Sequence, residues 1–391
     1  MITPLLHLKA GYSLDYYKTN YFYMNNKFNG RNIMKKSKKM LWPLTLLVLL
    51  IFALTACTKE QPSLNEKAQA APAQRAVSAK PVQQEGKKIT KDTKIALISE
   101  FTSGTHAAQY ITGVTKAAKK AGVQLSVSDS NNDQSKMAAY LDTAINQNVD
   151  GIMIDHGRAE TLEPGVKRAI AKGIPVIATD VELKVEGVTT IDQDDYMLAL
   201  QGLKQMMQDI NGKGNIVYAF VGGFAPMEKR DSIYKIMMNR YPDVKQIATF
   251  GSATDNTSLD TQNKMAAVLK QYPNKGDIAA VWAPWDEFAK GVTRAIKEAG
   301  RDEIKVYGVD LSDEDLQMMQ AKNSPWKASA AVNPASVGEK QVDLLLKKIS
   351  GQEIPRYYSF DPVLVKQTDL PNQTINMDQL SQYVEEWGKK E

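Results

Sequence analysis

The sequence predicts an α/β protein in which two lobes each contain a doubly wound parallel sheet. After Lys91, short β-branched runs alternate with amphipathic helical windows, the pattern of a parallel sheet covered by helices. This alternation occurs twice, with about five strands in each series. The composition agrees, because a chain of 391 residues that is 43% hydrophobic and 24% charged is typical of globular domains. It excludes a disordered or coiled-coil chain.

The strands and helices follow from hydrophobic periodicity. The first series of strands is expected at 94–99, 124–128, 151–155, 174–179 and 188–191. The second is expected at 215–221, 246–250, 278–282, 305–309 and 327–332. Helices are expected between them, among others at 106–121, 134–146 and 285–299. In the first of these, Ile111, Val114 and Ala118 recur at helical spacing, so one face packs on a sheet.

An export signal precedes the lobes. Residues 34–39 are basic, and the sixteen residues 41–56 are largely apolar and end at Cys57. This run is shorter than the roughly 20 apolar residues of a membrane span, and its small terminal residues are typical of a secretory signal. The segment Leu-Thr-Ala-Cys at 54–57 resembles the lipobox of bacterial lipoproteins, which implies that Cys57 is lipidated. The alternative is an uncleaved anchor helix, and either would export the lobes and tether them to a membrane.

The segments on either side of the signal are not expected to form a core. Residues 1–33 fit no targeting class, and we interpret them as an upstream extension, with Met34 as the true start and 34–56 as the signal peptide. Residues 57–90 are rich in Pro, Gln, Ala and Lys and contain no aromatic residue, which predicts a flexible tether.

Charge and residue content exclude several function classes. The net charge is +5, but residues 1–56 hold eight Lys or Arg against one Asp and contribute +7, which leaves −2 for the rest. The lobes therefore have no charge pattern for nucleic acid. One cysteine excludes a disulfide framework and a cysteine-clustered metal site.

Motifs for enzymatic chemistry are missing from the sequence. We find no dinucleotide fingerprint, Walker loop, nucleophile elbow or zincin motif, so neither a cofactor nor a metal is expected. Cleft carboxylates could act as a glycosidase pair, but nothing in their spacing sets the separation of two of them. The protein is not expected to be an enzyme.

Polar and aromatic side chains follow the predicted strands at their carboxyl ends. In doubly wound sheets the ligand crevice lies outside these ends, so two facing lobes would share one cleft. Carboxylates there would bind hydroxyl groups and aromatic faces would cover C–H surfaces, which suits a sugar. The candidate residues at these strand ends are Phe101, Asp155, His156, Asp180, Phe224, Trp285 and Asp310.

Four segments resemble motifs of one protein family, in the family's order and spacing. They are Trp-Asp-Glu-Phe-Ala-Lys-Gly at 285–291, Val-Tyr-Gly-Val-Asp at 306–310, Gly-Ile-Pro-Val-Ile-Ala-Thr-Asp at 173–180 and Met-Glu-Lys-Arg at 227–230. Residues 94–362 thus resemble the type I periplasmic solute-binding proteins, in particular the ribose/galactose-binding branch. The resemblance implies the type I periplasmic-binding-protein fold, in which a three-segment hinge joins the lobes.

The resemblance also implies site residues and lobe boundaries. Asp180, Arg230 and Asp310 match the family's charged ligand residues, and either Asp155 or His156 stands where a polar ligand residue is usual. Crossings are implied near 192–195, 332–334 and 359–362. The first lobe would then be 91–193 with 334–359, and the second 194–333 with 360–391.

Four departures from the family pattern bear on the ligand. Val181 stands where the family often has Arg, and Trp285 replaces its usual Asn. His106 stands where stacking aromatics follow the first strand, and Asn333 lies beside the position of the family's Gln. We therefore expect His106 and Asn333 in the cleft, and a ligand other than ribose, with fewer polar groups on one edge or stacked on Trp285.

Each assignment has a structural alternative. Asp180 and Asp310 could cap the helices that follow their strands. Trp285 could fill the core of its lobe, and Phe101 and Phe224 could pack under loops. His106 could be a helix cap or a solvated residue, whereas Asp286 is expected to cap the helix that it begins.

The resemblance implies an exported, lipid-anchored, monomeric binding protein that delivers a monosaccharide or sugar alcohol to the permease of an ABC importer. One alternative is a sensory role, in which the liganded protein is presented to a membrane receptor. The effector domain of a lac-type repressor shares the fold, but a signal and lipobox occupy the place of its DNA-binding segment.

Overall fold

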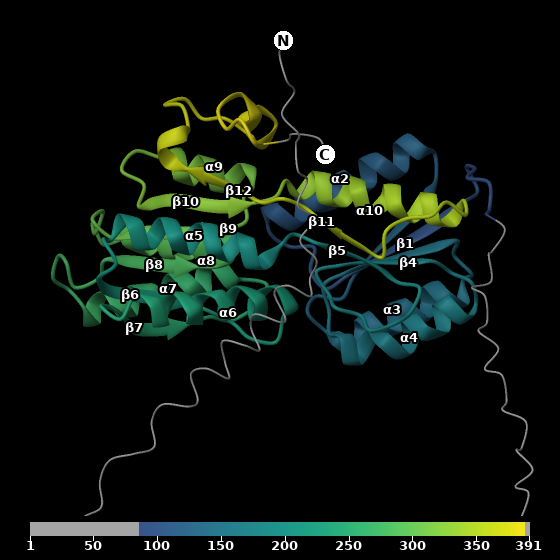
Figure 1. The fold of residues 1–391 in the computed structure, drawn as a ribbon, viewed down its shortest axis with the longest axis horizontal. Helices are drawn as coiled ribbons and strands as arrows, with labels where there is room; N and C mark the ends of the chain where they lie inside the picture. The colour runs from purple at the N-terminus through teal and green to yellow at the C-terminus, as the bar shows by residue number, and fades with distance from the viewer. Residues whose placement is uncertain (1–85, 388–391) are drawn as a thin grey trace, which may run out of the picture. The chain divides into compact units, whose positions relative to one another are not determined.

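Two six-stranded sheets organise the part of the chain that the computed structural model describes, residues 86–387 (Figure 1). These residues all belong to one compact unit, Ser78–Glu391. The predicted extension, the signal peptide, Cys57 and most of the predicted tether lie outside the described residues. Within 86–387, no helix has the length and apolar character needed to span a membrane.

The first sheet is parallel throughout, in the order β11-β5-β4-β3-β1-β2. Its strands are β1 (Lys94–Ser99), β2 (Gln124–Asp129), β3 (Gly151–Asp155), β4 (Val176–Thr179), β5 (Thr189–Asp192) and β11 (Tyr357–Ser359). Its helices are α2 (Thr105–Ala121), α3 (Gln134–Asn146), α4 (Ala159–Ala171) and α10 (Pro334–Ile349).

The second sheet has the order β12-β10-β9-β8-β6-β7, and only β12 is antiparallel to its neighbour. Its strands are β6 (Gly214–Ala219), β7 (Val244–Phe250), β8 (Ala280–Ala283), β9 (Lys305–Val309), β10 (Trp326–Ala331) and β12 (Val363–Lys366). Its helices are α5 (Asp195–Asp209), α6 (Ala225–Arg240), α7 (Thr257–Gln271), α8 (Asp286–Glu298) and α9 (Asp313–Gln320). The short helices η1 (Gln367–Asp369) and η2 (Met377–Gln382) follow β12.

Helices cover both faces of each sheet, because alternate residues of a strand point to opposite sides. In β1, Ile95 and Leu97 join the core beneath α2 and α10, whereas Ala96 and Ile98 join the core beneath α3 and α4. Figure 1 shows α10 on one side of the first sheet and α3 and α4 on the other. This two-sided burial explains the continuous apolar runs in the sequence.

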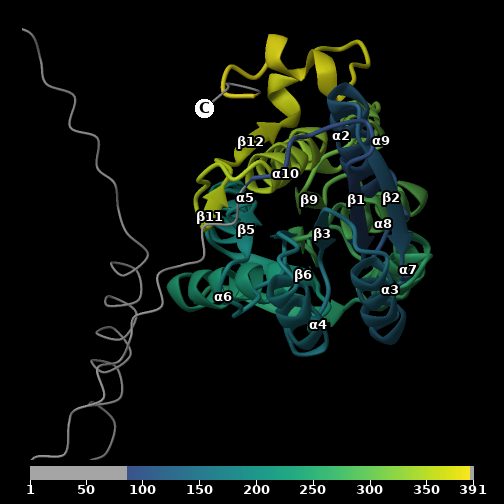
Figure 2. The same ribbon diagram turned by 90° about the vertical axis from the view of Figure 1, so that its right-hand side faces the viewer.

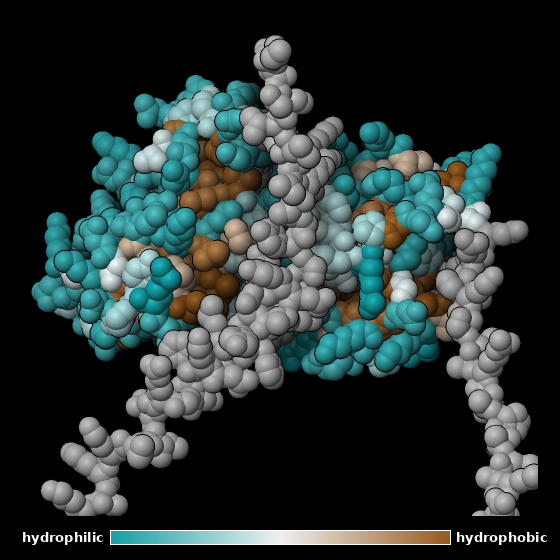
Figure 3. Space-filling view, viewed as in Figure 1, coloured by the Kyte–Doolittle hydropathy of each residue, from teal (hydrophilic) through white to brown (hydrophobic). Residues whose placement is uncertain are grey.

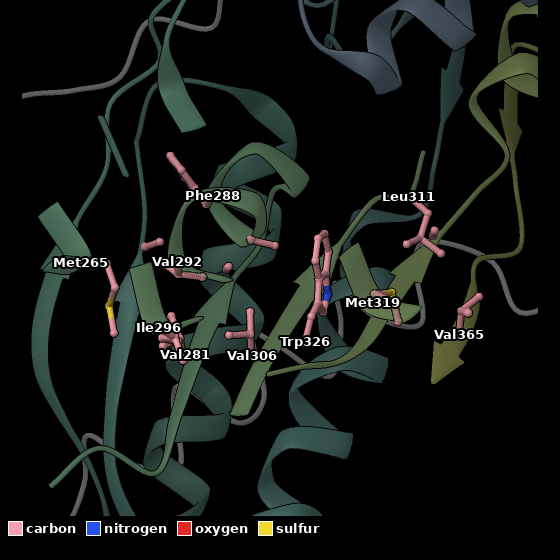
Figure 4. Packing of buried hydrophobic residues seen from close by; sticks show 14 of the residues in the cluster. Met265, Val281, Phe288, Val292, Ile296, Val306, Leu311, Met319, Trp326 and Val365 are labelled. Carbon is pink, nitrogen blue, oxygen red and sulfur yellow. The ribbon is translucent and has the colours of Figure 1, made fainter. Parts of the chain in front are cut away.

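The second sheet is covered in the same way. On one face lie α5 and α6, and on the other lie α7, α8 and α9. Figure 4 shows Val292 and Ile296 of α8 beside Val281 and Val306 of the sheet, all four fully buried. The predicted fold class, two doubly wound α/β lobes, is confirmed.

The chain passes between the two sheets three times. It leaves the first sheet after β5 to form α5, returns after β10 to form α10, and leaves again between β11 and β12. Figure 2 shows β11 and β12 following one another along this last passage. All three crossings involve the edge strands β11 and β12 or their neighbours β5 and β10, so they lie at corresponding edges of the two sheets.

The surface drawn in Figure 3 is mainly hydrophilic, with apolar patches between the polar residues. Exposed large apolar side chains among the described residues include Tyr196 and Leu200 on α5 and Tyr357 on β11. Apolar atoms contribute much of any folded protein's surface, so scattered residues of this kind are ordinary.

Candidate ligand-binding site

A cavity of about 100 Å³ lies where the carboxyl ends of the two sheets meet. Its lining includes nine of the ten candidate ligand residues, which are Phe101, His106, Asp155, His156, Asp180, Phe224, Arg230, Trp285 and Asp310. The tenth, Asn333, is not part of the lining. Its Oδ1 accepts the backbone N–H groups of Ala335 and Ser336 at 3.0 and 3.3 Å, so this side chain caps α10.

Arg230 organises the side of the cavity that the second sheet forms. It projects from the first turns of α6 and is only 3% exposed. Its Nε donates to Asp195 at 2.8 Å, its Nη1 donates to the carbonyl of Pro284 at 2.7 Å, and both terminal nitrogens donate to Asp310 at 3.1 and 3.3 Å. The planar guanidinium thus binds three acceptors at once, which fixes its position before any ligand enters.

Three charged residues at adjacent strand ends form the side of the first sheet. His156 Nδ1 lies 2.8 Å from a carboxylate oxygen of Asp155, whose other oxygen accepts the hydroxyl of Ser99 at 2.7 Å. His156 Nε2 lies 4.0 Å from Asp180, which also accepts the amide of Gln193 at 2.7 Å. The sequence left open whether Asp155 or His156 reaches the cavity, and both line it.

Burial and the charges of nearby residues shift the pKa of Asp180. Burial is the main cause that raises the pKa of Asp180 to about 7; the charges of Asp195, Asp192 and Asp155 add to it, and His156 opposes it.

Burial alone would lower the pKa of His156, but the charge and hydrogen bond of Asp155 outweigh it. With the charges of Asp180 and Glu100, they raise the pKa of His156 to about 10. The imidazole is therefore a cation at neutral pH.

Three of the site residues adopt left-handed backbone conformations directly after their strands. The φ angles are 59° at His156, 56° at Asp180 and 73° at Asp310. Asp and His are among the few residue types besides Gly and Asn found in this region with some frequency. The sharp change of direction ends each strand and places the side chain at the sheet edge, in the cavity lining.

Several buried polar atoms at the cavity have no partner among the described residues. They are Asp180 Oδ1, Gln193 Oε1, Thr179 Oγ1, His106 Nε2 and both carboxylate oxygens of Asp286. Buried polar groups in folded proteins are almost always hydrogen-bonded, and leaving one unpaired costs about 1–3 kcal/mol. A ligand that donates hydrogen bonds to Asp180 Oδ1 and Gln193 Oε1 would remove part of this cost.

Aromatic rings form another part of the lining. The centroid of Phe101, which follows β1, lies 5.9 Å from that of Phe224 and 6.3 Å from that of Trp285. Phe224 and Trp285 directly precede α6 and α8, which cover the second sheet, so the three rings form one group across the two lobes. Trp285 also packs on Phe288, at 5.2 Å between centroids, so it both lines the cavity and contributes to the core.

Hydrogen bonds join the two lobes around the cavity. The hydroxyls of Thr105 and Ser312 lie 2.7 Å apart, and Lys290 Nζ donates to Thr105 at 3.2 Å. The Asn132 amide donates to the carbonyl of Ala253 at 3.2 Å. The structure therefore has the two lobes closed upon each other.

Sequence reasoning missed some lining residues and misplaced one cap. Gln193 was included in a predicted crossing segment, and its place next to Asp192 at the end of β5 was the signal that could have found it. Asp286 does not cap α8: Trp285 occupies the cap position without a side-chain hydrogen bond, and Asp286 is the first helical residue. Its buried carboxylate lies 3.4 Å from Lys290 Nζ and also lines the cavity.

Asp155, His156 and Asp180 could together approach a metal ion, because their ligand atoms lie within 4.8 Å of one another. However, His156 Nδ1 is bonded to Asp155, and the raised pKa keeps the second ring nitrogen protonated at neutral pH. A protonated imidazole has no lone pair for a metal. The geometry thus favours a surface that binds hydroxyl groups.

Comparison with known proteins identifies the family. Residues 95–353 match the periplasmic binding protein domain. The chain belongs to this family. The resemblance drawn from the four sequence segments is thereby confirmed.

Relatives of this periplasmic binding protein come from several bacteria. It is 29% identical to the xylitol-binding protein of Mycolicibacterium smegmatis over 59% of this chain, and the match spans 65% of that protein. A sugar ABC transporter structure from Yersinia enterocolitica is 36% identical, with a TM-score of 0.74, over 76% of this chain and 91% of that one. The 5-methylthioribose transporter solute-binding protein of Thermotoga lettingae, in complex with 5-methylthioribose, is also 36% identical, with a TM-score of 0.74, over 77% and 96%.

Proposed function

We propose that this periplasmic binding protein is the substrate-binding component of an ABC importer. It captures a monosaccharide or sugar alcohol in the cavity between its lobes and delivers it to the permease. The observation that carries the proposal is the cavity, where unpartnered buried acceptors and aromatic rings meet at the carboxyl ends of both sheets. The named ligands of two relatives, xylitol and 5-methylthioribose, are a sugar alcohol and a sugar.

Binding in this proposal involves no covalent chemistry. Asp180 and Gln193 would accept hydrogen bonds from ligand hydroxyls, and the Arg230 side would present a fixed surface opposite them. Closure of the lobes about the three crossings excludes water, so each hydrogen bond gains strength in the low-dielectric interior. The lobes, 91–193 with 334–359 and 194–333 with 360–391, would open for release to the permease. The protein is thus a binding protein, as members of its family are, and not an enzyme.

The alternative of a sensory role is not favoured. Of the three relatives reported above, two are named for transport and one for binding a sugar alcohol.

The proposal includes export and lipid anchoring. Residues 34–56 would direct export, Cys57 would carry the lipid, and residues 57–90 would tether a monomeric binding unit at the membrane surface. Mass spectrometry of the purified N-terminus should find an acylated Cys57. A mature chain that keeps residues 1–56 and an unmodified cysteine would contradict the anchoring.

A thermal unfolding screen tests the binding function. The full chain, purified in mild detergent, is heated with pentoses, hexoses, sugar alcohols and nucleosides. A ligand that binds only the folded state at 100 times its Kd adds about 2.7 kcal/mol and raises the Tm clearly. Sucrose at the same concentration controls for general stabilisation by excluded solutes. If no monosaccharide or sugar alcohol raises the Tm beyond sucrose, the proposal is wrong.

A further inference from the structure

The beginnings of α2 and α8, one from each lobe, meet at one end of the cavity. Lys290 Nζ of α8 donates to Thr105 Oγ1 of α2 at 3.2 Å. Glu287 also approaches the backbone at the N-cap of α2, where an added Cβ atom would lie 2.8 Å from its Oε1. His106 follows Thr105, Asp286 precedes Glu287, and both line the cavity. These two side chains therefore belong to the same end of the lining.

The carboxylate of Asp286 is buried at this end without a hydrogen bond. The residue is 1% exposed, and neither carboxylate oxygen has a partner among the described residues. The ammonium of Lys290 lies 3.4 Å away, but an ammonium has only three N–H donors. Those of Lys290 go to Thr105, Glu287 and Glu314. Lys290 thus has no N–H left for Asp286.

The two cations of the cavity lining are matched by other carboxylates. His156 lies 2.8 Å from Asp155, and Arg230 lies 3.1 Å from Asp310. Neither is therefore free to compensate the charge of Asp286. A buried carboxylate that has neither a cation of its own nor a hydrogen bond is costly, so a ligand that supplies both would be bound strongly.

His106 adds a third acceptor to the two oxygens of Asp286. Its Nε2 is buried without a partner, and in the neutral tautomer that carries the proton on Nδ1 this atom accepts a hydrogen bond. Three acceptor atoms match the three N–H donors of a primary ammonium group. A hydroxyl group has one O–H donor and brings no charge, so it would satisfy this end only in part.

The aromatic rings suit the same occupant. The centroid of Phe101 lies 5.9 Å from that of Phe224 and 6.3 Å from that of Trp285, the residue before Asp286. The faces of aromatic rings attract a cation, most strongly where water is excluded. Rings beside an unpaired carboxylate therefore favour a positively charged group over an apolar one.

A second group of acceptors lies elsewhere in the lining, near the crossings. Asp180 Oδ1 and Gln193 Oε1 are buried without partners, and these residues follow β4 and β5. In the first sheet, β3 separates β4 from β1, the strand that leads into α2 and His106. The cavity thus offers hydrogen-bond acceptors in two places, and the charge that lacks a cation lies at the α8 end.

We propose that the ligand is a compact sugar or sugar alcohol that carries a protonated primary amine. Its ammonium group binds Asp286 and His106 among the aromatic rings, and its hydroxyls bind Asp180 and Gln193. The cavity of about 100 Å³ suits a compact molecule of this kind. This inference rests on the proposed function and narrows its substrate class.

Calorimetric titration of the full chain in detergent at pH 7 tests the inference with matched pairs of probes. The members of each pair differ only by an amine or a hydroxyl at one carbon. The pairs are 1-amino-1-deoxyribitol with ribitol, 2-amino-2-deoxyribose with ribose, and glucosamine with glucose. Hydrogen bonds between charged groups are about twice as strong as neutral ones, so in at least one pair the amine should have a Kd about tenfold or more lower.

The outcomes separate the inference from the proposed function. A smaller preference for the amine in every pair, or a preference for the hydroxyl, overturns the inference. The proposed function then still stands if any sugar or sugar alcohol binds. Failure of every probe, in titration and in the thermal screen, refutes both.

A substitution at Asp286 separates the ammonium site from the rest of the cavity. Asp286→Asn keeps the shape of the side chain and removes its charge. It should raise the Kd of the best amine about tenfold and change that of the matching hydroxyl compound by less than about threefold. Asp142→Asn, at a residue of α3 outside the lining, is the control and should change neither Kd by much.

Equal weakening of both members of a pair in Asp286→Asn would contradict the inference, because the carboxylate would then not distinguish the amine. Lys290 keeps its other partners in this variant, so the fold should be retained. Unfolding of the variant without ligand checks this expectation. The titrations of the wild-type chain decide the inference even if the variant does not fold.

Discussion

The cavity has two walls, one formed by residues at the end of the first sheet and one by residues at the end of the second. The charged residues of the two walls differ in how fully they are hydrogen-bonded. On the second-sheet wall, Arg230 makes four hydrogen bonds to three residues, and its bonding partners are provided within the same lobe. On the first-sheet wall, Asp180 keeps one oxygen without a partner, as does the neighbouring Gln193. Around Arg230 the second wall is therefore organised in advance, whereas around Asp180 and Gln193 the first wall retains bonding capacity for the ligand. On the second wall such capacity is found at the carboxylate of Asp286, which has no hydrogen-bond partner. We infer that Arg230 serves mainly the fold of its wall and that Asp180 serves mainly binding.

Removing the charge of Arg230 should have the largest effect. In Arg230→Met, the carboxylates of Asp195 and Asp310 stay buried without their cation. Breaking a buried ion pair in this way costs about 3–5 kcal/mol of unfolding free energy. Urea unfolding measures the loss, and Arg230→Lys, which keeps the charge but lacks the planar donor fork of the guanidinium, should fall between the variant and the wild type. If Arg230→Met lowers the unfolding free energy by less than about 1 kcal/mol, Arg230 does not serve mainly the fold, and the two walls do not differ in the way described.

Asp180→Asn should instead weaken binding with little loss of stability. Replacing the charged acceptor should raise the Kd of the best ligand about 10- to 100-fold, since hydrogen bonds to charged groups contribute about 1.5–3 kcal/mol. Because burial raises the pKa of Asp180 from 3.8 to about 7, the unfolded chain is charged well below pH 7 while the folded chain is charged only above it, so above about pH 7 the full cost of the buried charge lowers the unfolding free energy. The unfolding free energy of the variant at higher pH should therefore equal or exceed that of the wild type.

Titration and unfolding together check this prediction. Asp142→Asn, at a residue of α3 whose side chain is half exposed and lies outside the cavity, is the matched control and should alter neither quantity by much. A loss of stability in Asp180→Asn as large as in Arg230→Met would show that both walls serve the fold.

His156→Gln should have the smallest effect, on the pH dependence of stability. The pKa of His156 is raised from 6.5 to about 10 in the folded state, so its stabilising contribution is complete below pH 6.5 and is lost as the pH rises through 10. We expect the wild type to lose about 2 kcal/mol more than the variant over this interval. Unfolding at several pH values measures the difference. Parallel curves for the two proteins would show that the ion pair with Asp155 contributes nothing to the fold.

The regular part of the fold could be predicted because its signals are local. The bounds of β1, β3 and β9 agree with the predicted strands residue for residue, since each is an apolar run within a sheet buried on both faces. The strands β11 and β12 were not predicted. They are three and four residues long. The partner of β11 lies more than a hundred residues away, and the partner of β12 is β10, which α10 and β11 separate from it along the chain. Nothing within such short segments distinguishes a strand from a connection.

The site residues that directly follow a buried strand could be predicted from the sequence, whereas the others were harder to place. Asp180, His156 and Asp310 follow directly from the ends of buried strands. Asn333 precedes Pro334, and an Asn followed by Pro at the first helical position is a typical helix cap, a local signal that outweighed the family pattern. Gln193 follows the end of β5 as the other site residues follow their strands, but it was interpreted only as part of a crossing segment.

The left-handed residue Asp180 bears on how this protein can change in evolution. Glycine at this position would relax the backbone by about 1 kcal/mol and remove a carboxylate whose charged form is disfavoured by burial. A lineage that no longer needed its ligand would gain stability by losing this side chain, whereas His156 and Asp310 are held in ion pairs with Asp155 and Arg230. Retention of Asp180 in a descendant sequence would therefore record continued selection for binding, independently of any measurement of that descendant's activity.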